Sequence, residues 1–328
     1  MRVGLALGAG GVVGAAWMVG ALDALEQRGG LATADAAELL GTSVGSLLAA
    51  MVAAEVPTAA MTAYASGEQR SALAALDGHD ATARRLTRLP LPLGPGSLRM
   101  ALAGRSRAKV LTGLLPRGVL SIEPLAELVE RVIGASWPSL RSLVLVACDY
   151  SSGERVALGP GLEPHCTPAE AVCASCAIPA FYEPVAIGAR LYIDGGVHSH
   201  SNLDLLAGRG LDTVIALNPL SSAAWVAGGG GLRERLARIQ RRRSATQLRA
   251  EVELLRADQL PPGSDGAPPK QSTVRKLPAP IVRDADDRQV LLEVVEFYHQ
   301  APKQSPERVP RSYSGPTGIT PRLFVIMY

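Results

Sequence analysis

Short apolar runs and helix-like stretches alternate near the start of the chain. Residues 2–7 are mostly apolar and predict a buried strand, and the loop 8–11 that follows contains three glycines. Over residues 14–28, apolar side chains recur at helical spacing before a pair of glycines. Residues 39–40 predict a second strand, and a strongly apolar helix then continues to Ala54. This order of strand, loop and helix is typical of α/β proteins.

Three later apolar runs, at residues 143–147, 190–193 and 212–217, predict further strands, and the second of them ends directly before Asp194. We therefore expect a three-layer α/β/α sandwich with a mostly parallel central sheet. In such folds the active site lies at the carboxyl ends of the strands.

The pattern changes after residue 258. The segment 258–328 contains 11 of the 24 prolines, which argues against regular structure over most of its length. We expect a compact domain over 1–257 and a largely irregular tail over 258–328, with one apolar helix at 287–299.

Composition narrows the class of protein. Hydrophobic residues make up 47% of the chain and charged residues 19%, as in a globular protein. The net charge of +3 is too small to direct the whole molecule onto nucleic acid, so no nucleic-acid partner is expected. Residues 3–22 carry no charge and are long enough to span a bilayer, but their six glycines favour a strand, a loop and a helix. We expect a cytoplasmic protein that contacts membranes only peripherally.

The four cysteines are too few for a disulfide scaffold, so a reducing compartment is expected. Cys173 and Cys176 form one C-x-x-C pair, which is typical of zinc sites only when a second pair accompanies it. Buried thiols are the better interpretation, and neither a metal nor a cofactor is expected.

Residues 41–45 match G-x-S-x-G, with Ser43 between Gly41 and Gly45. At a sharp turn from strand to helix, the flanking glycines leave room for an exposed, nucleophilic serine. The partner of such a serine is usually a histidine held by an acid. His198 and His200 lie near Asp194 in the sequence and remain candidates, although both can equally be loop residues.

The glycine loop offers backbone N–H groups to either a phosphate or an oxyanion. Gly8-x-Gly10 opens like a dinucleotide fingerprint, but Val13 stands where its third glycine should fall, although Gly14 follows directly. Asp194-Gly195-Gly196 is the third motif, and by itself it is an ordinary turn signal.

The glycine loop, G-x-S-x-G and Asp-Gly-Gly follow one another in this order, each at the end of a predicted strand. Residues 174–179, Ala-Ser-Cys-Ala-Ile-Pro, add a fourth motif of the form A-S-x-A-x-P. With these motifs the sequence resembles the patatin-like phospholipase family over roughly residues 1–255. One departure is Val13, where the family usually carries a basic residue.

The resemblance implies hydrolysis of lipid esters, of the phospholipase A or lysophospholipase type, by a serine–aspartate dyad without a histidine. Ser43 would be the nucleophile and Asp194 the base. The N–H groups of Gly10, Gly11 and Val12 would form the oxyanion hole. The supporting motif positions would be Gly8, Gly14, Gly41, Gly45, Gly195 and Gly196. The alternatives are a catalytically silent relative that serves as a scaffold and a nucleotide- or phosphate-binding module that uses the Gly8–Gly14 loop.

The segment 81–122 contains eight Lys or Arg residues and no acid. Its prolines and glycines favour a solvated excursion from the core. The functional interpretation is a lid or a surface that meets anionic lipid head groups.

Overall fold

The computed structural model describes residues 2–29, 32–66, 86–87, 96–103, 106–138, 142–220 and 232–258, and five short strands between residues 274 and 327. Side chains are described up to residue 255, apart from 28–29, 107 and 232–241. Most of the basic segment before residue 96 therefore lies outside the described residues.

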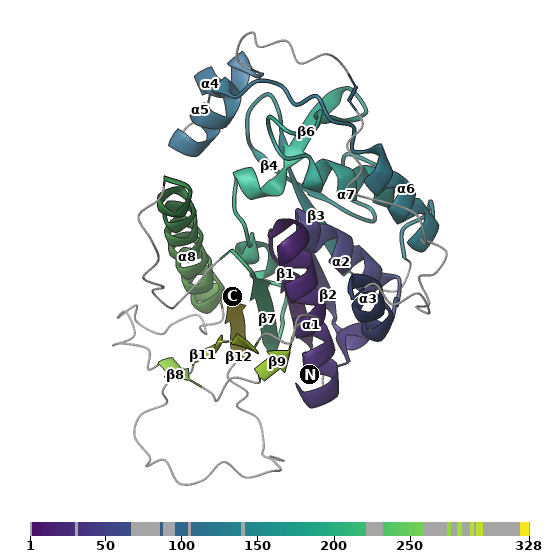
Figure 1. The fold of residues 1–328 in the computed structure, drawn as a ribbon, viewed down its shortest axis with the longest axis vertical. Coiled ribbons are helices and arrows are strands. Elements are labelled where there is room, and N and C mark those ends of the chain that lie inside the picture. The colour runs from purple at the N-terminus through teal and green to yellow at the C-terminus, as the bar shows by residue number, and fades with distance from the viewer. Residues whose placement is uncertain are drawn as a thin grey trace.

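A mixed sheet of ten strands forms the centre of the molecule (Figure 1). Five neighbouring strands run parallel in the order β3-β2-β1-β7-β12. Their bounds are Ser142–Asp149, Glu38–Thr42, Val3–Leu7, Thr213–Asn218 and Arg322–Met327.

Antiparallel strands flank this parallel centre on both sides. Strand β3 pairs with β6 (Arg190–Asp194) and β4 (Arg155–Leu158), and β6 pairs in turn with β5 (Val185–Ile187). Strand β12 pairs with β11 (Glu293–Phe297), which pairs in turn with β8 (Val274–Lys276). The strands β9 (Ile281–Arg283) and β10 (Gln289–Leu291) pair separately.

Helices cover both faces of the sheet, because the strand residues alternate between two cores. Leu5 and Leu145 face a core shared with the helices α1, α2, α3, α6 and α7. Ala6 and Val146 face the opposite core, where α8 packs with the short helix η4 (Leu203–Leu206). The α-helix bounds are Gly11–Gly29, Val44–Ala53, Thr58–Ala65, Glu123–Val132 and Pro168–Cys176 on the first face, and Leu232–Asp258 on the second. Two further helices, α4 (Leu98–Ala103) and α5 (Arg107–Leu114), form a hairpin beyond β6.

This architecture confirms the expected α/β/α sandwich with a parallel sheet at its centre. The uncharged stretch 3–22 divides into β1, a loop and the start of α1, which begins at Gly11, three residues earlier than expected. Within the described part of the chain, every helix is too short or too polar to cross a bilayer.

The expected helix over 287–299 is wrong. Residues 289–291 and 293–297 form β10 and β11, and β11 pairs with β12. A short apolar run does not distinguish a strand from a helix, and here β-branched valines and a distant partner strand decide the outcome. The proposed boundary at residue 257 stays a prediction, although strands that follow it extend the same sheet.

Candidate active site

Ser43 lies at the turn between β2 and α2 and has a backbone φ of 56° and ψ of −130°. A positive φ is costly for a residue with a side chain and persists only where the surroundings impose it. Both glycines of the motif are needed for this packing. A Cβ on Gly45 would overlap the carbonyl of Leu7 at the end of β1, and one on Gly41 would overlap the backbone of Ser46. The turn therefore presses the start of α2 against the sheet edge and presents the Ser43 hydroxyl there.

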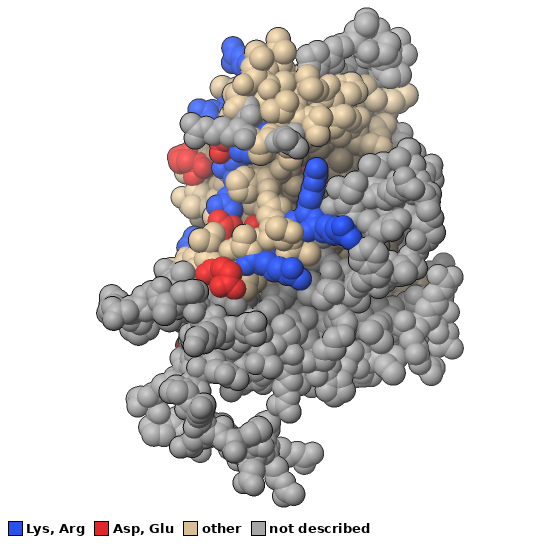
Figure 2. Space-filling view, turned by 90° about the vertical axis from the view of Figure 1, so that its left-hand side faces the viewer, with Lys and Arg blue, Asp and Glu red and all other residues tan. Residues whose placement is uncertain are grey.

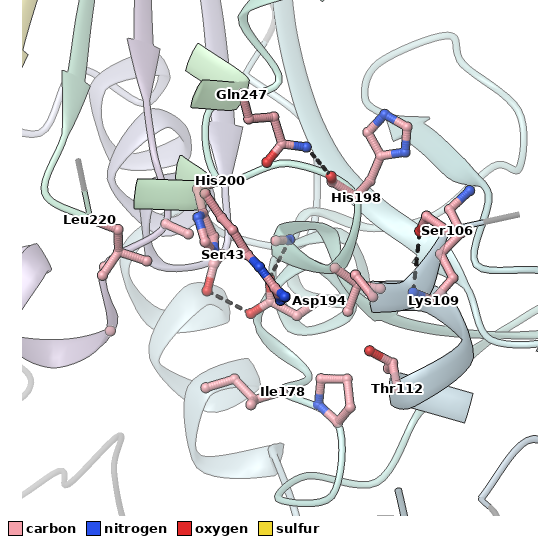
Figure 3. A pocket seen from close by; sticks show the side chains of 18 of the residues that line it. Ser43, Ser106, Lys109, Thr112, Ile178, Asp194, His198, His200, Leu220 and Gln247 are labelled. Atoms are coloured by element: carbon pink, nitrogen blue, oxygen red, sulfur yellow. Dashed lines mark hydrogen bonds between the residues drawn. The ribbon is translucent and has the colours of Figure 1, made fainter. Parts of the chain in front are cut away.

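Asp194 is the last residue of β6, and its carboxylate reaches the hydroxyl of Ser43 (Figure 3). The Oγ of Ser43 donates to Oδ2 of Asp194 at 2.6 Å, and both residues are buried. The backbone N–H of Gly196 donates to Oδ1 at 2.7 Å. A Cβ on Gly195 would overlap the carbonyl of Val146, which explains the glycine directly after the carboxylate.

The order of the strands explains how two residues so distant in the chain meet. Strand β3 pairs with both β2 and β6, with Val146 opposite Thr42 and the next residue, Ala147, opposite Asp194. Because β2 runs parallel to β3 and β6 runs antiparallel to it, the carboxyl ends of β2 and β6 meet at neighbouring positions along β3.

Ser175 fixes the backbone of Ser43 and was not predicted as a site residue. The Oγ of Ser175 accepts the backbone N–H of Ser43 at 2.9 Å and donates to the carbonyl of Val146 at 2.6 Å. Ser175 is fully buried on α7. The sequence signal for this role is the A-S-x-A-x-P segment, because Ser175 is the serine of that segment.

The glycine loop lies next to this pair. Gly10 and Gly11 line the same cavity as Ser43 and Asp194, and α1 begins at Gly11. The first N–H groups of a helix have no partner within the helix, so the start of α1 places such donors beside the cavity. Val12 is exposed and is not among the described residues that line the cavity.

Other N–H groups of the glycine loop form backbone hydrogen bonds that fix its conformation. The N–H of Gly8 donates to the carbonyl of Leu217, and that of Ala9 donates to the carbonyl of His200, both at 2.8 Å. Gly10 and Gly14 pack so closely against Pro219 that a Cβ on either would contact its ring.

A family model described as patatin-like phospholipase matches residues 5–207 of this sequence. The chain belongs to the patatin-like phospholipase family. The matched region runs from β1 through η4 and contains the glycine loop, Ser43, Ser175 and Asp194.

Solved structures similar to this patatin-like chain include VipD from Legionella pneumophila, with 15% identity, a TM-score of 0.40, and coverage of 77% of this chain and 55% of VipD. The type III effector ExoU matches with 16% identity, a TM-score of 0.32, and coverage of 76% and 53%. A complex of SpcU with ExoU from Pseudomonas aeruginosa gives 18% identity, a TM-score of 0.31, and coverage of 78% and 52%. The chain thus spans about half the length of these structures. No curated protein matches its sequence.

A cavity of about 1030 Å³ opens over the pair in this patatin-like domain. His198 and His200 line it from the loop after β6, while Ile178 and Thr112 line the opposite side (Figure 3). The pKa of each histidine is lowered, and burial is the main cause. Among the described residues, the hydroxyl of Ser43 is hydrogen-bonded to Asp194 and to neither histidine.

The electrostatics of the carboxylate differ from those of a surface aspartate. Burial raises the pKa of Asp194 from its ordinary value of 3.8 to about 6, and the hydrogen bonds from Ser43 and Gly196 oppose this shift. The carboxylate is therefore a stronger base than an exposed aspartate and still ionised at neutral pH.

Two of the four cysteines, Cys148 and Cys173, are buried, and Cys166 and Cys176 are partly buried against the core. All four are free thiols, and Cys173 and Cys176 both lie on α7. Burial raises the pKa of Cys173 to about 12 and that of Cys148 to about 12. Thiols of this kind are poor nucleophiles at neutral pH.

Proposed function

We propose that the protein is a serine acyl hydrolase of lipid esters in which Ser43 is the nucleophile and Asp194 is its base. The observation that carries this proposal is the 2.6 Å hydrogen bond from the Ser43 hydroxyl to the Asp194 carboxylate inside the cavity. A buried carboxylate that directly accepts the proton of a serine at a strand-to-helix turn is the arrangement that nucleophilic acyl transfer needs.

The acylation step follows from this geometry. The Ser43 oxygen forms a bond to the ester carbonyl carbon while its proton moves to Oδ2 of Asp194. The oxyanion that develops faces the N–H groups of Gly10, Gly11 and Val12, of which the first two line the cavity. The tetrahedral intermediate then collapses, and the alcohol leaves with the proton from Asp194.

In the deacylation step, a water molecule is the nucleophile and the serine oxygen is the leaving group. Asp194 takes a proton from a water molecule, the resulting hydroxide attacks the acyl-serine, and the fatty acid leaves as Ser43 regains its proton. In this scheme neither His198 nor His200 transfers a proton, because Asp194 contacts Ser43 directly.

The experiment that tests the proposal combines labelling with turnover. A fluorophosphonate probe should modify the wild-type protein at one site, and peptide mapping should identify that site as Ser43. A panel of lipid esters, including phospholipids, lysophospholipids and acylglycerols, should release fatty acid only with unmodified protein. A folded protein that takes no label and cleaves no ester would support a silent scaffold instead.

Nucleotide binding is the weaker alternative. The N–H groups of Gly8 and Ala9 donate to backbone carbonyls, which leaves fewer donors in the Gly8–Gly14 loop for a phosphate. Saturable binding of nucleotides in a titration, without ester hydrolysis, would favour this alternative.

The pH profile should follow the ionisation of Asp194. Because a base must be deprotonated, kcat/KM for a neutral ester is expected to rise tenfold per pH unit below about pH 6 and to level off above it. The measurement is the pH dependence of kcat/KM. A profile that keeps rising through pH 7 would instead indicate a base whose pKa is higher than that of Asp194.

Ser175→Ala is expected to lower kcat by roughly ten- to a hundredfold with little change in KM, since a misplaced nucleophile affects the chemical step. The substitution removes two hydrogen bonds to buried backbone groups, the N–H of Ser43 and the carbonyl of Val146. The rate of fluorophosphonate labelling should fall in parallel.

Ser46→Ala is the matched control for this positioning role. Ser46 is equally buried, and its Oγ also contacts the backbone of Ser43, donating to the carbonyl at 2.6 Å. Because the N–H of Ser46 donates to the same carbonyl, the substitution leaves that oxygen bonded. Equal losses of kcat in both variants would show that Ser175 contributes only to general packing.

A further inference from the structure

The α4–α5 hairpin exposes an unusual amount of apolar surface. Leu102 is 79% exposed and Leu111 is 57% exposed. Five of the twelve large hydrophobic residues that are exposed in the described part of the chain lie on this hairpin or directly after it. They are Leu98, Leu102, Leu111, Leu114 and Leu115.

These leucines are not needed to hold the hairpin to the rest of the protein. Met100 of α4 and Lys109 of α5 point inward, Met100 is fully buried, and Lys109 donates to Glu154 at 2.8 Å. Leu98 and Leu102 are one helical turn apart, as are Leu111 and Leu115, so each pair lies on one side of its helix. The hairpin therefore has an apolar outward face in addition to the inward face that packs against the protein.

The apolar surface continues to the cavity. Thr112 and Leu115 line the cavity from the α5 side, and Ile178 lines it from the end of α7 (Figure 3). Phe181 is also exposed, and its carbonyl accepts the N–H of Leu120 in the segment that leads away from α5. A planar partner on this face would thus cover the cavity mouth.

The charged residues of the α4–α5 segment itself are all basic, and Lys109 pairs with Glu154 of a neighbouring loop. Arg99 on α4 and Arg117 after α5 are exposed, and among the described residues neither has a carboxylate within ion-pair distance. The sequence from 81 to 122 contains no acid. Figure 2, which faces this side of the molecule, shows its uppermost described part as uncharged surface with isolated Lys or Arg side chains.

We propose that this α4–α5 surface, defined as the five exposed leucines with Arg99 and Arg117, docks on an anionic lipid bilayer. Exposed apolar side chains enter the acyl boundary, and arginines attract acidic head groups at the same depth. A second copy of the chain is a poorer occupant, because two acid-free basic surfaces repel each other. The proposal rests on the proposed function only in that docking would bring lipid esters to the mouth of the cavity above Ser43.

The test uses the full-length Ser43→Ala protein, which does not consume the vesicles, in a flotation assay. We expect strong binding to vesicles of phosphatidylcholine mixed with phosphatidylglycerol and weak binding to phosphatidylcholine alone. Leu102→Asp and Leu111→Asp should each weaken binding by roughly tenfold or more. Arg99→Gln with Arg117→Gln should weaken binding to the anionic vesicles by about an order of magnitude and leave the residual binding to phosphatidylcholine unchanged.

Leu254→Asp is the matched control, because Leu254 on α8 is also exposed, at 56%, but lies outside this surface. Its vesicle binding should equal that of the parent. Equal binding by the Leu102→Asp, Leu111→Asp and Leu254→Asp proteins would overturn the docking surface, as would concentration-dependent dimerisation that is lost in the first two variants.

Two readouts separate this proposal from the proposed function. In a wild-type background, Leu102→Asp should reduce hydrolysis of vesicle lipid but not of a short-chain soluble ester. If no ester is hydrolysed while the leucine-dependent flotation persists, the enzymatic proposal fails and the docking surface stands.

Discussion

Replacing Ser43 with alanine is expected to lower kcat/KM for ester hydrolysis by a factor on the order of 10⁵ or more, and to abolish fluorophosphonate labelling. In the proposed mechanism, the hydroxyl that donates to Asp194 is the group that forms the acyl intermediate. The turn itself is imposed by close packing around Gly41 and Gly45, so the variant should fold normally. Steady-state kinetics on a soluble ester, with circular dichroism as a check of folding, provides the measurement.

Ser46→Ala is the control for this prediction as well, because it removes a buried serine hydroxyl from the same turn without touching the proposed chemistry. Full activity in the Ser43→Ala protein would exclude Ser43 as the nucleophile. Activity that falls equally in both variants would indicate damage to the turn rather than loss of a reacting group.

Asp194→Asn is expected to change activity and stability in opposite directions. Without a base, kcat should fall by a factor on the order of 10⁴, as when the acid of a catalytic triad is replaced by its amide. The folded protein should nevertheless be more stable at pH 8. The buried carboxylate has a pKa of about 6 instead of 3.8, and keeping it ionised costs up to about 3 kcal/mol of unfolding free energy.

The pH dependence of this gain has a definite sign. Between about pH 4 and pH 6 the folded wild-type protein binds more protons at Asp194 than the unfolded chain does, so its stability falls as the pH rises through this window. The advantage of Asp194→Asn should therefore be largest above pH 6 and disappear below about pH 4. Chemical denaturation at several pH values would measure it. A variant that is less stable than the wild type at pH 8 would contradict the assigned burial penalty.

The sequence predicted the parts of the structure that depend on local patterns. Strands β1, β3 and β7 and the turn around Ser43 follow from short apolar runs and from glycines that must sit at close approaches. These signals are local, since each needs only its own few residues to be recognised.

The parts that were missed depend on contacts between distant segments. Ser175 gains its role only because α7 brings its hydroxyl between Ser43 and Val146. Residues 293–297 become a strand because β12 is available for pairing. The outward leucines of α4 and α5 are likewise ordinary in sequence, and only the folded hairpin shows that they are left uncovered.

The pairing of β3 with both β2 and β6 also has a consequence for folding kinetics. The parallel pairing of β2 with β3 closes a loop of about a hundred residues, and the β3–β6 pairing must follow before the carboxylate can reach the hydroxyl. In the proposed mechanism, a nascent chain that has produced only β1, β2 and β3 holds the serine nucleophile without its proton acceptor. Activity would therefore require the β3–β6 pairing, and an intermediate that lacks it would be unable to attack lipid.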